Sequence, residues 1–283
     1  MEHTEGFGGL PSYCRVQGGT LLSCRICDGE LVLPEGITAI AKRAFSGNRT
    51  LRAIRLPDSL ERIGEYAFSD CVALEAVTFG RGLRKLGDGA LMGCRSLRTL
   101  TLPEGIGEMG AELLRGCTGL TAVTLPRDLT VLPALFFADC TALGEVALPE
   151  GLLTIGGSAF SGCTALRTLT VPAHVARIGA QAFSGCTGLE AISFLFSGVI
   201  DVGPSVFSGC RSPLPVTFAG SGGTLCRNFG ERITPPPYET MYGERGEGVR
   251  HYPLGHPLGE GFTLLADCRE DGRAVTLSGH REA

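Results

Sequence analysis

The sequence from Thr164 to Cys186, TALRTLTVPAHVARIGAQAFSGC, is one copy of a 23-residue unit that recurs through most of the chain. Its final cysteine marks the period, because cysteine stands at the same position of six successive copies and one residue late in a seventh: Cys71, Cys94, Cys117, Cys140, Cys163, Cys186 and Cys210. A chain that repeats a short unit builds a stack of similar pieces, each of which buries its apolar side against the next. The period therefore predicts a solenoid.

The first half of the unit predicts a strand. It contains the pattern Leu-x-x-Ile-x-Leu, represented here by Leu166, Leu169 and Val171, in which apolar and polar residues alternate at the end. Alternation at period two is typical of a strand with one buried face. A proline follows in six copies, at Pro34, Pro57, Pro103, Pro126, Pro149 and Pro172. Because proline has no amide hydrogen, we expect the strand to end there.

The second half of the unit predicts a short helical turn. It runs through Ile-Gly, as in Ile178-Gly179, to an Ala-Phe-Ser-Gly-Cys segment, as in residues 182–186. The length of this segment suits one helical turn closed by glycine.

Together these columns resemble a family, the BspA-like bacterial leucine-rich repeats, whose consensus is similar to Leu-x-x-Ile-x-Leu-Pro-x-Gly-Leu-x-x-Ile-Gly-x-x-Ala-Phe-x-Gly-Cys. The resemblance covers about residues 31–218. It implies an α/β repeat fold, a curved leucine-rich-repeat solenoid with a ladder of parallel strands on the concave face, short helical turns on the other side and a small cap at each end. Several members of this family have a cell-surface or host-binding role, which the resemblance implies for this chain by analogy only.

The composition along the chain divides it into three expected parts. These are an N-terminal cap at 1–30, a solenoid of about eight repeats plus a degenerate one at 31–233, and a Pro-rich linker with a C-terminal hairpin or tail at 234–283. In the first part, Gly18-Gly19 predicts a hairpin turn. In the last, Asp271-Gly272 predicts a second hairpin, between strands at 262–268 and 274–278. We expect that hairpin to cap the last repeat.

The chain contains twelve cysteines, and we expect all of them to be reduced and buried. An odd column of seven cannot pair completely within itself, and stacked side chains that point the same way fit disulfide geometry poorly. Asn48 takes the place of cysteine in one copy, which fits because both residues can hydrogen-bond the backbone in a tight turn. Reduced thiols, and a start without the features of a secretory signal, predict a cytoplasmic protein. The alternative, by family analogy, is the cell surface.

Charge and motifs favour a binding protein over an enzyme. The formal net charge is −4 without long runs of one sign, which argues against nucleic acid or an anionic membrane as partner. No apolar run is long enough to cross a membrane. We find no phosphate-binding glycine loop, nucleophile elbow or His-Glu-x-x-His motif. We therefore expect a monomeric, non-catalytic scaffold without a cofactor or metal, whose partner is another protein or a surface polymer.

The predicted binding surface is the exposed side of the strands. The outward positions between the apolar columns are Arg55, Thr78, Thr101, Thr124, Thr170 and Ser193. Beside the strands, a rim of mixed charge contains Arg52, Arg98 and Arg167, which alternate with Glu75 and Glu190. Two interpretations stay open. The threonines can form a cross-strand ladder that only stabilises the sheet, or the surface can be a smooth groove for an extended or globular partner.

A second hypothesis is a metal- or redox-linked protein that uses Cys24 and Cys27, which have Cys-x-x-Cys spacing. The tail adds residues that could converge on a metal, namely His251, His256, Asp267, Cys268 and His280. The opposing interpretation is that both cysteines only stabilise the cap and that the tail is solvated. A third hypothesis is an enzyme with its active site in the tail, which no motif supports.

Overall fold

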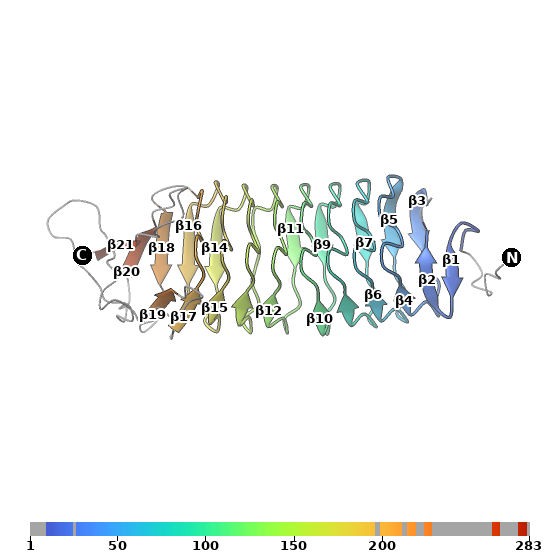
Figure 1. Ribbon diagram of the computed structural model, residues 1–283, viewed down its shortest axis with the longest axis horizontal. Helices are drawn as coiled ribbons and strands as arrows, with labels where there is room; N and C mark the ends of the chain where they lie inside the picture. The colour runs from blue at the N-terminus through green and yellow to red at the C-terminus, as the bar shows by residue number, and fades with distance from the viewer. Residues whose placement is uncertain are drawn as a thin grey trace. The chain divides into compact units, whose positions relative to one another are not determined.

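The structure is a computed structural model that describes residues 10–24, 27–195, 199–210, 214–218, 224–227, 262–266 and 277–281. These residues form β-strands and turns, and none of them lies in a helix. The chain divides into two compact units, unit 1 with residues 1–129 and 135–143 and unit 2 with residues 130–134 and 144–283. Figure 1 shows the strands of each unit, labelled in chain order.

Unit 1 contains eleven of the described strands. The cap strands are β1 (Arg15–Gln17) and β2 (Thr20–Ser23); the longer repeat strands are β3 (Gly29–Val32), β5 (Leu51–Arg55), β7 (Ala76–Thr78), β9 (Thr99–Thr101) and β11 (Ala122–Thr124); the two-residue strands are β4 (Ala39–Ile40), β6 (Arg62–Ile63), β8 (Lys85–Leu86) and β10 (Glu108–Met109).

Unit 2 contains the other ten. One group is β12 (Val131–Leu132), β13 (Thr154–Ile155), β15 (Arg177–Ile178), β17 (Val199–Val202) and β19 (Thr224–Arg227), and the other is β14 (Thr168–Val171), β16 (Ala191–Phe194), β18 (Leu214–Phe218), β20 (Phe262–Ala266) and β21 (Leu277–Arg281).

Successive repeats pair in parallel, and they do so in two ladders where the sequence predicted one. The predicted strands form β3-β5-β7 and β9-β11 in unit 1 and β14-β16-β18 in unit 2. A second ladder comes from the Ile-Gly position, as β2-β4-β6-β8-β10 in unit 1 and β12-β13-β15-β17-β19 in unit 2. Glycine follows this strand because a Cβ at Gly64 would lie 2.6 Å from the backbone nitrogen of Lys42 in the preceding repeat. The expected parallel solenoid is confirmed.

The interior of each unit is built from the leucine and phenylalanine columns. Leu74, Leu97 and Leu120 are fully buried in unit 1, and Leu166 and Leu189 in unit 2. The phenylalanine rings stack from one repeat to the next, Phe45 on Phe68 with centroids 4.7 Å apart in unit 1 and Phe160 on Phe183 at 5.5 Å in unit 2. Such contacts between equivalent residues bury each repeat against its neighbour and replace a globular core.

The expected helical turns are wrong for the described residues. The segment that leads to the repeat cysteine passes through positive φ twice in each repeat, for example at Tyr66 (54°) and Asp70 (55°). Its amides do not bond four residues back. The Ser69 amide donates to the Tyr66 carbonyl, whereas the Phe68 amide donates at 2.8 Å to Ala90 of the next repeat. An α-helix requires negative φ throughout and bonds within one segment, so these left-handed positions produce a chain of tight turns.

The cysteine column supplies a hydrogen bond between repeats. Cys71, Cys94, Cys117, Cys140 and Cys186 each donate from the thiol to a carbonyl of the preceding repeat over 3.0–3.2 Å. In the copy that lacks the cysteine, the Asn48 amide donates at 3.3 Å to the Cys27 carbonyl, and its oxygen accepts from the Leu51 amide at 2.7 Å. The column therefore requires a small side chain that donates to the backbone.

These thiols are reduced and buried, as expected for this column. Burial raises the pKa of Cys71 and of Cys117 to about 12, because a thiolate there would lose its hydration. At neutral pH the column therefore stays protonated, able to donate and chemically inert.

The N-terminal hairpin is confirmed, and of the C-terminal one the antiparallel strand pairing is present with one difference, while the turn predicted at Asp271-Gly272 lies outside the described residues. Gly18 and Gly19, at φ values of 52° and 69°, join β1 to β2 in antiparallel pairing. At the other end, β20 pairs antiparallel with both β18 and β21. Strand β21 occupies 277–281, three residues later than the strand predicted at 274–278. Residues 1–9 and the proline run at 235–237 lie outside the described residues.

We predict that Cys140→Asp lowers the free energy of unfolding by roughly 4 kcal/mol or more, because it puts an unpaired carboxylate in a fully buried column. The matched control Cys140→Ala removes the thiol hydrogen bond to Leu114 without adding a charge, and should cost about 1–2 kcal/mol. Urea unfolding of both variants measures the difference. Equal midpoints for the two variants and the parent would show that this column is not packed.

We also predict that truncation after Ile233 destabilises unit 2. It removes β20 and β21 and leaves the backbone of β18 unpaired along one edge, which exposes a template for association. The melting temperature should fall by at least about 2–4 °C, the shift that 1 kcal/mol produces in a chain of this size. Light scattering should show concentration-dependent association. An unchanged melting temperature and a monodisperse sample would mean that the hairpin does not protect β18.

Candidate functional site

The predicted outward residues lie on the exposed side of the longer strands. In unit 1, Arg55 pairs in register with Thr78, and Thr101 with Thr124. All four side chains are exposed, whereas Ile54 and Leu100, which precede Arg55 and Thr101 in their strands, are buried. In unit 2, Thr170 pairs with Ser193, which is half-buried. We call these outward residues the strand face of their unit.

One repeat of unit 2 does not contribute to its strand face. Residues 144–149 occupy the strand position of their copy but form no strand, and Val146 and Leu148 are only half-buried. Gly144, Glu145 and Ala147 stand where Arg167, Thr168 and Thr170 stand in the copy that forms β14. Glycine, glutamate and alanine are depleted in strands, whereas threonine is enriched, which accounts for the lost strand.

The rim arginines differ in what they contact. In unit 1, Nη2 of Arg52 lies 2.8 Å from Oε1 of Glu75, and this hydrogen bond raises the pKa of Arg52. In unit 2, Arg167 forms the equivalent ion pair with Glu190. Arg98 has no carboxylate partner among the described residues, because the next repeat carries Thr121 where the others carry glutamate. Of the three rim arginines, Arg52 and Arg167 form ion pairs, and Arg98 forms none with the described residues.

The turn side of unit 1 contains a shallow, open depression of about 640 Å³ that the sequence did not reveal. The Arg43 guanidinium lies 5.7 Å from the centre of the Tyr66 ring. Arg115 contacts two carboxylates, Glu112 at 3.0 Å and Asp139 at 3.8 Å. The available signal was in the first positive-φ position of each copy, where Arg43, Tyr66 and Glu112 stand and another copy of unit 1 carries Gly89.

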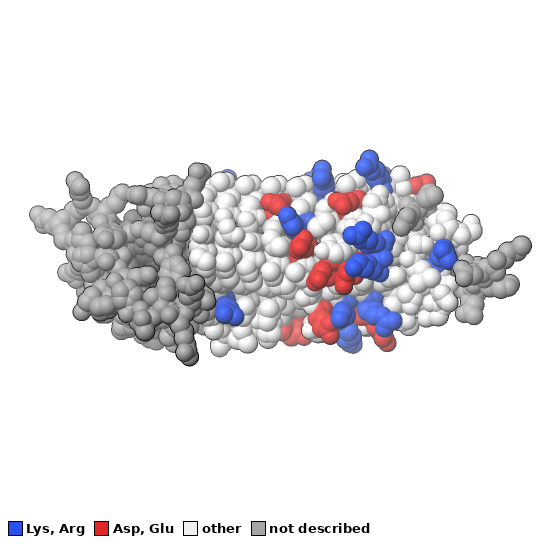
Figure 2. Space-filling view, in the orientation of Figure 1, with Lys and Arg blue, Asp and Glu red and all other residues white. Residues whose placement is uncertain are grey.

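Among the described residues, most charged side chains belong to unit 1. Figure 2 shows lysine, arginine and acidic side chains gathered over unit 1 on the face in view, while most of the described surface of unit 2 is uncharged there. Many of these charges are paired between repeats, as Lys42 with Glu65 at 2.5 Å and Lys85 with Glu108 at 2.5 Å. The hydrogen bond from Lys42 lowers the pKa of Glu65.

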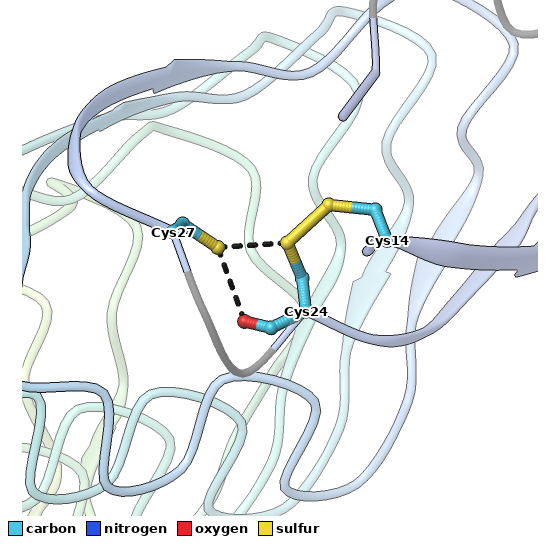
Figure 3. Close-up of side chains that lie close together, drawn as sticks. All are labelled: Cys14, Cys24 and Cys27. Atoms are coloured by element: carbon cyan, nitrogen blue, oxygen red, sulfur yellow. Dashed lines mark hydrogen bonds between the residues drawn. A yellow bond between two sulfur atoms is a disulfide. The ribbon is translucent and has the colours of Figure 1, made fainter. Parts of the chain in front are cut away.

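The cap contains a disulfide, so the expectation of twelve reduced cysteines is wrong. Cys14 and Cys24 are bonded, with Cα atoms 4.4 Å apart. They flank the antiparallel pair Arg15↔Ser23 of β1 and β2, and antiparallel pairing brings their side chains face to face. The prediction considered only the parallel stack of repeats, where equivalent side chains point the same way. The thiol of Cys27 lies beside this disulfide (Figure 3).

The metal hypothesis is changed by this geometry. Cys24 and Cys27 do lie together, but the third sulfur near them is that of Cys14, which the hypothesis did not include. The side chains of His251, His256, Asp267, Cys268 and His280, which the hypothesis added from the tail, lie outside the described residues. The described residues also contain no helix with the length and apolar character needed to span a membrane.

Comparison with known proteins identifies the repeat. A family model for the BspA type leucine rich repeat region matches this chain in six copies, over residues 24–144 and 109–221. The chain belongs to this family. No curated protein matches it.

Solved structures of bacterial leucine-rich repeat proteins are similar to the chain at a distance. The T. pallidum protein is 25% identical and aligns over 67% of this chain and 80% of its own, with a TM-score of 0.49. A Bacteroides ovatus protein is 20% identical over 68% and 75%, with a TM-score of 0.43. A leucine rich cell surface protein of Faecalibacterium prausnitzii is 16% identical over 71% and 90%, with a TM-score of 0.31.

We predict that Arg98→Ala leaves the melting temperature unchanged, since its guanidinium has no carboxylate partner among the described residues to lose. Arg52→Ala, the matched variant on the same rim, should lower it slightly at low ionic strength because Glu75 loses its ion pair. Added salt should remove that difference. Scanning calorimetry at two salt concentrations tests both predictions. A larger fall in melting temperature for Arg98→Ala than for Arg52→Ala would contradict the assignment of the ion pair to Arg52.

Proposed function

We propose that this protein is a non-catalytic scaffold that binds another protein across the strand face of unit 1. The observation that carries the proposal is Arg98, an arginine without a carboxylate partner among the described residues, at the rim of a face of exposed threonines. A guanidinium in this state can form two parallel hydrogen bonds to a carboxylate of a partner. Proteins of this repeat family normally supply binding surfaces and not catalytic groups, which supports the non-catalytic part.

The composition of the strand face supports a protein partner. Thr78, Thr101 and Thr124 expose hydroxyl groups that can donate or accept, and Arg55 adds a second guanidinium in register with Thr78. Arginine is enriched in protein interfaces and frequent among the residues that dominate binding energy. The partner therefore presents an acidic side chain opposite Arg98 and polar groups opposite the threonines.

Unit 2 supports the proposal less well. Its rim arginine, Arg167, already contacts Glu190, and its strand face is short because residues 144–149 form no strand. Binding there would have to break an intramolecular ion pair before forming a new one, which reduces the gain. We therefore assign the binding surface to unit 1.

We also propose that the chain acts at the cell surface. The Cys14–Cys24 disulfide supports this location, because disulfides persist in oxidising compartments and are rare in the cytosol. The prediction of a cytoplasmic protein rested in part on twelve reduced cysteines, and two of the three cap cysteines are bonded to each other instead. The reduced thiols of the repeat column agree with either compartment, since burial protects them from oxidation.

We predict that a photoreactive amino acid at Thr101, in the strand face, crosslinks to one protein of defined mass when the full chain is irradiated with surface fractions from its own cells. The control label at Thr118, which lines the depression on the turn side, should give no such adduct. Arg98→Ala should reduce the Thr101 adduct several-fold, and Arg52→Ala should not.

Three results would contradict the proposal. The first is an adduct only at Thr118. The second is an adduct at both positions whose yield is the same in the Arg98→Ala variant. The third is a Thr101 adduct that a protease leaves intact and a glycosidase removes. The first two would move the binding surface, and the last would identify a surface polymer as partner.

A further inference from the structure

The cap cysteines are arranged for chemistry that the repeat scaffold does not need. Cys14 directly precedes β1 and Cys24 directly follows β2, and their disulfide closes the hairpin. The sulfur of Cys27 lies 2.7 Å from that of Cys24, and the three sulfurs all lie within 4.8 Å of one another. Figure 3 shows the Cys27 sulfur on the side of the Cys24 sulfur that faces away from Cys14. This is the direction from which a thiolate attacks a disulfide.

We propose that Cys14, Cys24 and Cys27 form an intramolecular thiol–disulfide exchange site. The Cys27 thiolate attacks the sulfur of Cys24 and forms the Cys24–Cys27 bond. The Cys14–Cys24 bond breaks, its electron pair stays on the Cys14 sulfur, and that sulfur takes up a proton. One disulfide and one thiol are present before and after, so the step needs no oxidant or reductant. The reverse step uses the Cys14 thiolate in the same way.

Cys24 is the shared partner for two independent reasons. It belongs to a Cys-x-x-Cys pair with Cys27, a spacing that closes readily into a disulfide, and to the antiparallel hairpin with Cys14. The Cys27 thiol also donates at 3.1 Å to the Cys24 carbonyl, which holds it close to the sulfur that it attacks. All three residues are at most 2% exposed, so dissolved thiols do not easily compete with the internal reaction.

The surroundings of Cys27 make the exchange slow at neutral pH. Burial raises the pKa of Cys27 to about 11, and the carboxylate of Asp28 adds to the shift. Among the described residues, the Cys71 thiol also interacts with it electrostatically. Since only the thiolate attacks, the rate should rise about tenfold for each pH unit below that pKa.

The exchange has a structural consequence at the first edge of unit 1. While Cys14 and Cys24 are bonded, β1 is tied to β2 and covers the edge of the β2-β4-β6-β8-β10 ladder. With the bond between Cys24 and Cys27, the disulfide no longer ties the three residues of β1, which keep their backbone pairing with β2 and the buried side chain of Val16. A short antiparallel strand of this kind is marginal alone, and its departure exposes the edge of β2. The position of one disulfide thus controls whether this edge is covered.

Trypsin makes the proposal directly testable, because Arg15 and Arg25 separate the three cysteines into peptides 1–15, 16–25 and 26–42. The full chain is incubated in glutathione redox buffer between pH 7 and 9, alkylated, digested and analysed by mass spectrometry. We expect peptide 16–25 to be linked to 1–15 in one fraction and to 26–42 in another. The second fraction should appear about ten times faster at pH 8 than at pH 7.

Two variants define the expected chemistry. Cys27→Ala should give only the pair of peptides 16–25 and 1–15, and Cys14→Ala only the pair of 16–25 and 26–42. In Cys14→Ala, the amides of β1 should also exchange with deuterium faster than in Cys27→Ala, because β1 is no longer tied.

The proposal is overturned if the parent chain keeps the Cys14–Cys24 pair alone at every pH, or if Cys14→Ala leaves Cys24 and Cys27 both alkylated in the same buffer. It is equally overturned if chain prepared with reductant and zinc holds one equivalent of the metal on the three sulfurs and then forms neither linked pair on oxidation. That last result would make the cluster a thiolate metal site. None of these results depends on the strand face, so the proposed scaffold function stands or falls separately.

Discussion

The hydrogen bonds between equivalent positions of successive repeats are the interaction on which the rest of this structure depends. In the turn segment, the amides of Tyr66, Phe68 and Asp70 all donate to carbonyls of the next repeat, over 2.7–2.8 Å. The two strand ladders also join successive repeats, and each of the buried thiols donates to a carbonyl of the preceding repeat. Because each repeat has little interior of its own, a constant 23-residue register is what allows the backbone to be paired and the phenylalanine rings to stack.

The same register decides which charges are available for binding. A residue meets the residue 23 positions further on, so Arg52 meets Glu75 and Lys42 meets Glu65. Where the sequence breaks the alternation, as at Thr121, the arginine of the preceding repeat is left without a carboxylate partner among the described residues. Departures from the repeat are therefore the places where a repeat protein can acquire specificity, since the conforming residues satisfy one another. The depression around Tyr66 and Arg115 on the turn side of unit 1 also lies where copies differ, since Arg43, Tyr66 and Glu112 stand at the position that holds Gly89 in another copy.

The N-terminal cap follows different rules from the repeats. Its hairpin is antiparallel, so it places side chains opposite each other where the parallel stack places them side by side. This difference explains why the chain can keep a column of reduced cysteines and a disulfide at once. It also brings a third cysteine to the disulfide and gives the cap a reactive arrangement, whereas the column cysteines are spread along the stack and remain inert.

The sequence by itself determined the repeat, the first strand ladder and the buried columns, because each depends on a period that returns many times, and the hairpin turn at Gly18-Gly19, because that turn depends on local pattern. It also identified the outward residues, since alternation in a strand leaves no other side for Thr101 or Arg55. Only the tertiary structure decided the rest. Left-handed φ at residues such as Tyr66 replaced the expected helical turn because bonds to the next repeat compensate for the local cost. The meeting of Cys14, Cys24 and Cys27 depends on which residues face each other across neighbouring strands, and spacing along one strand carries no direct record of that.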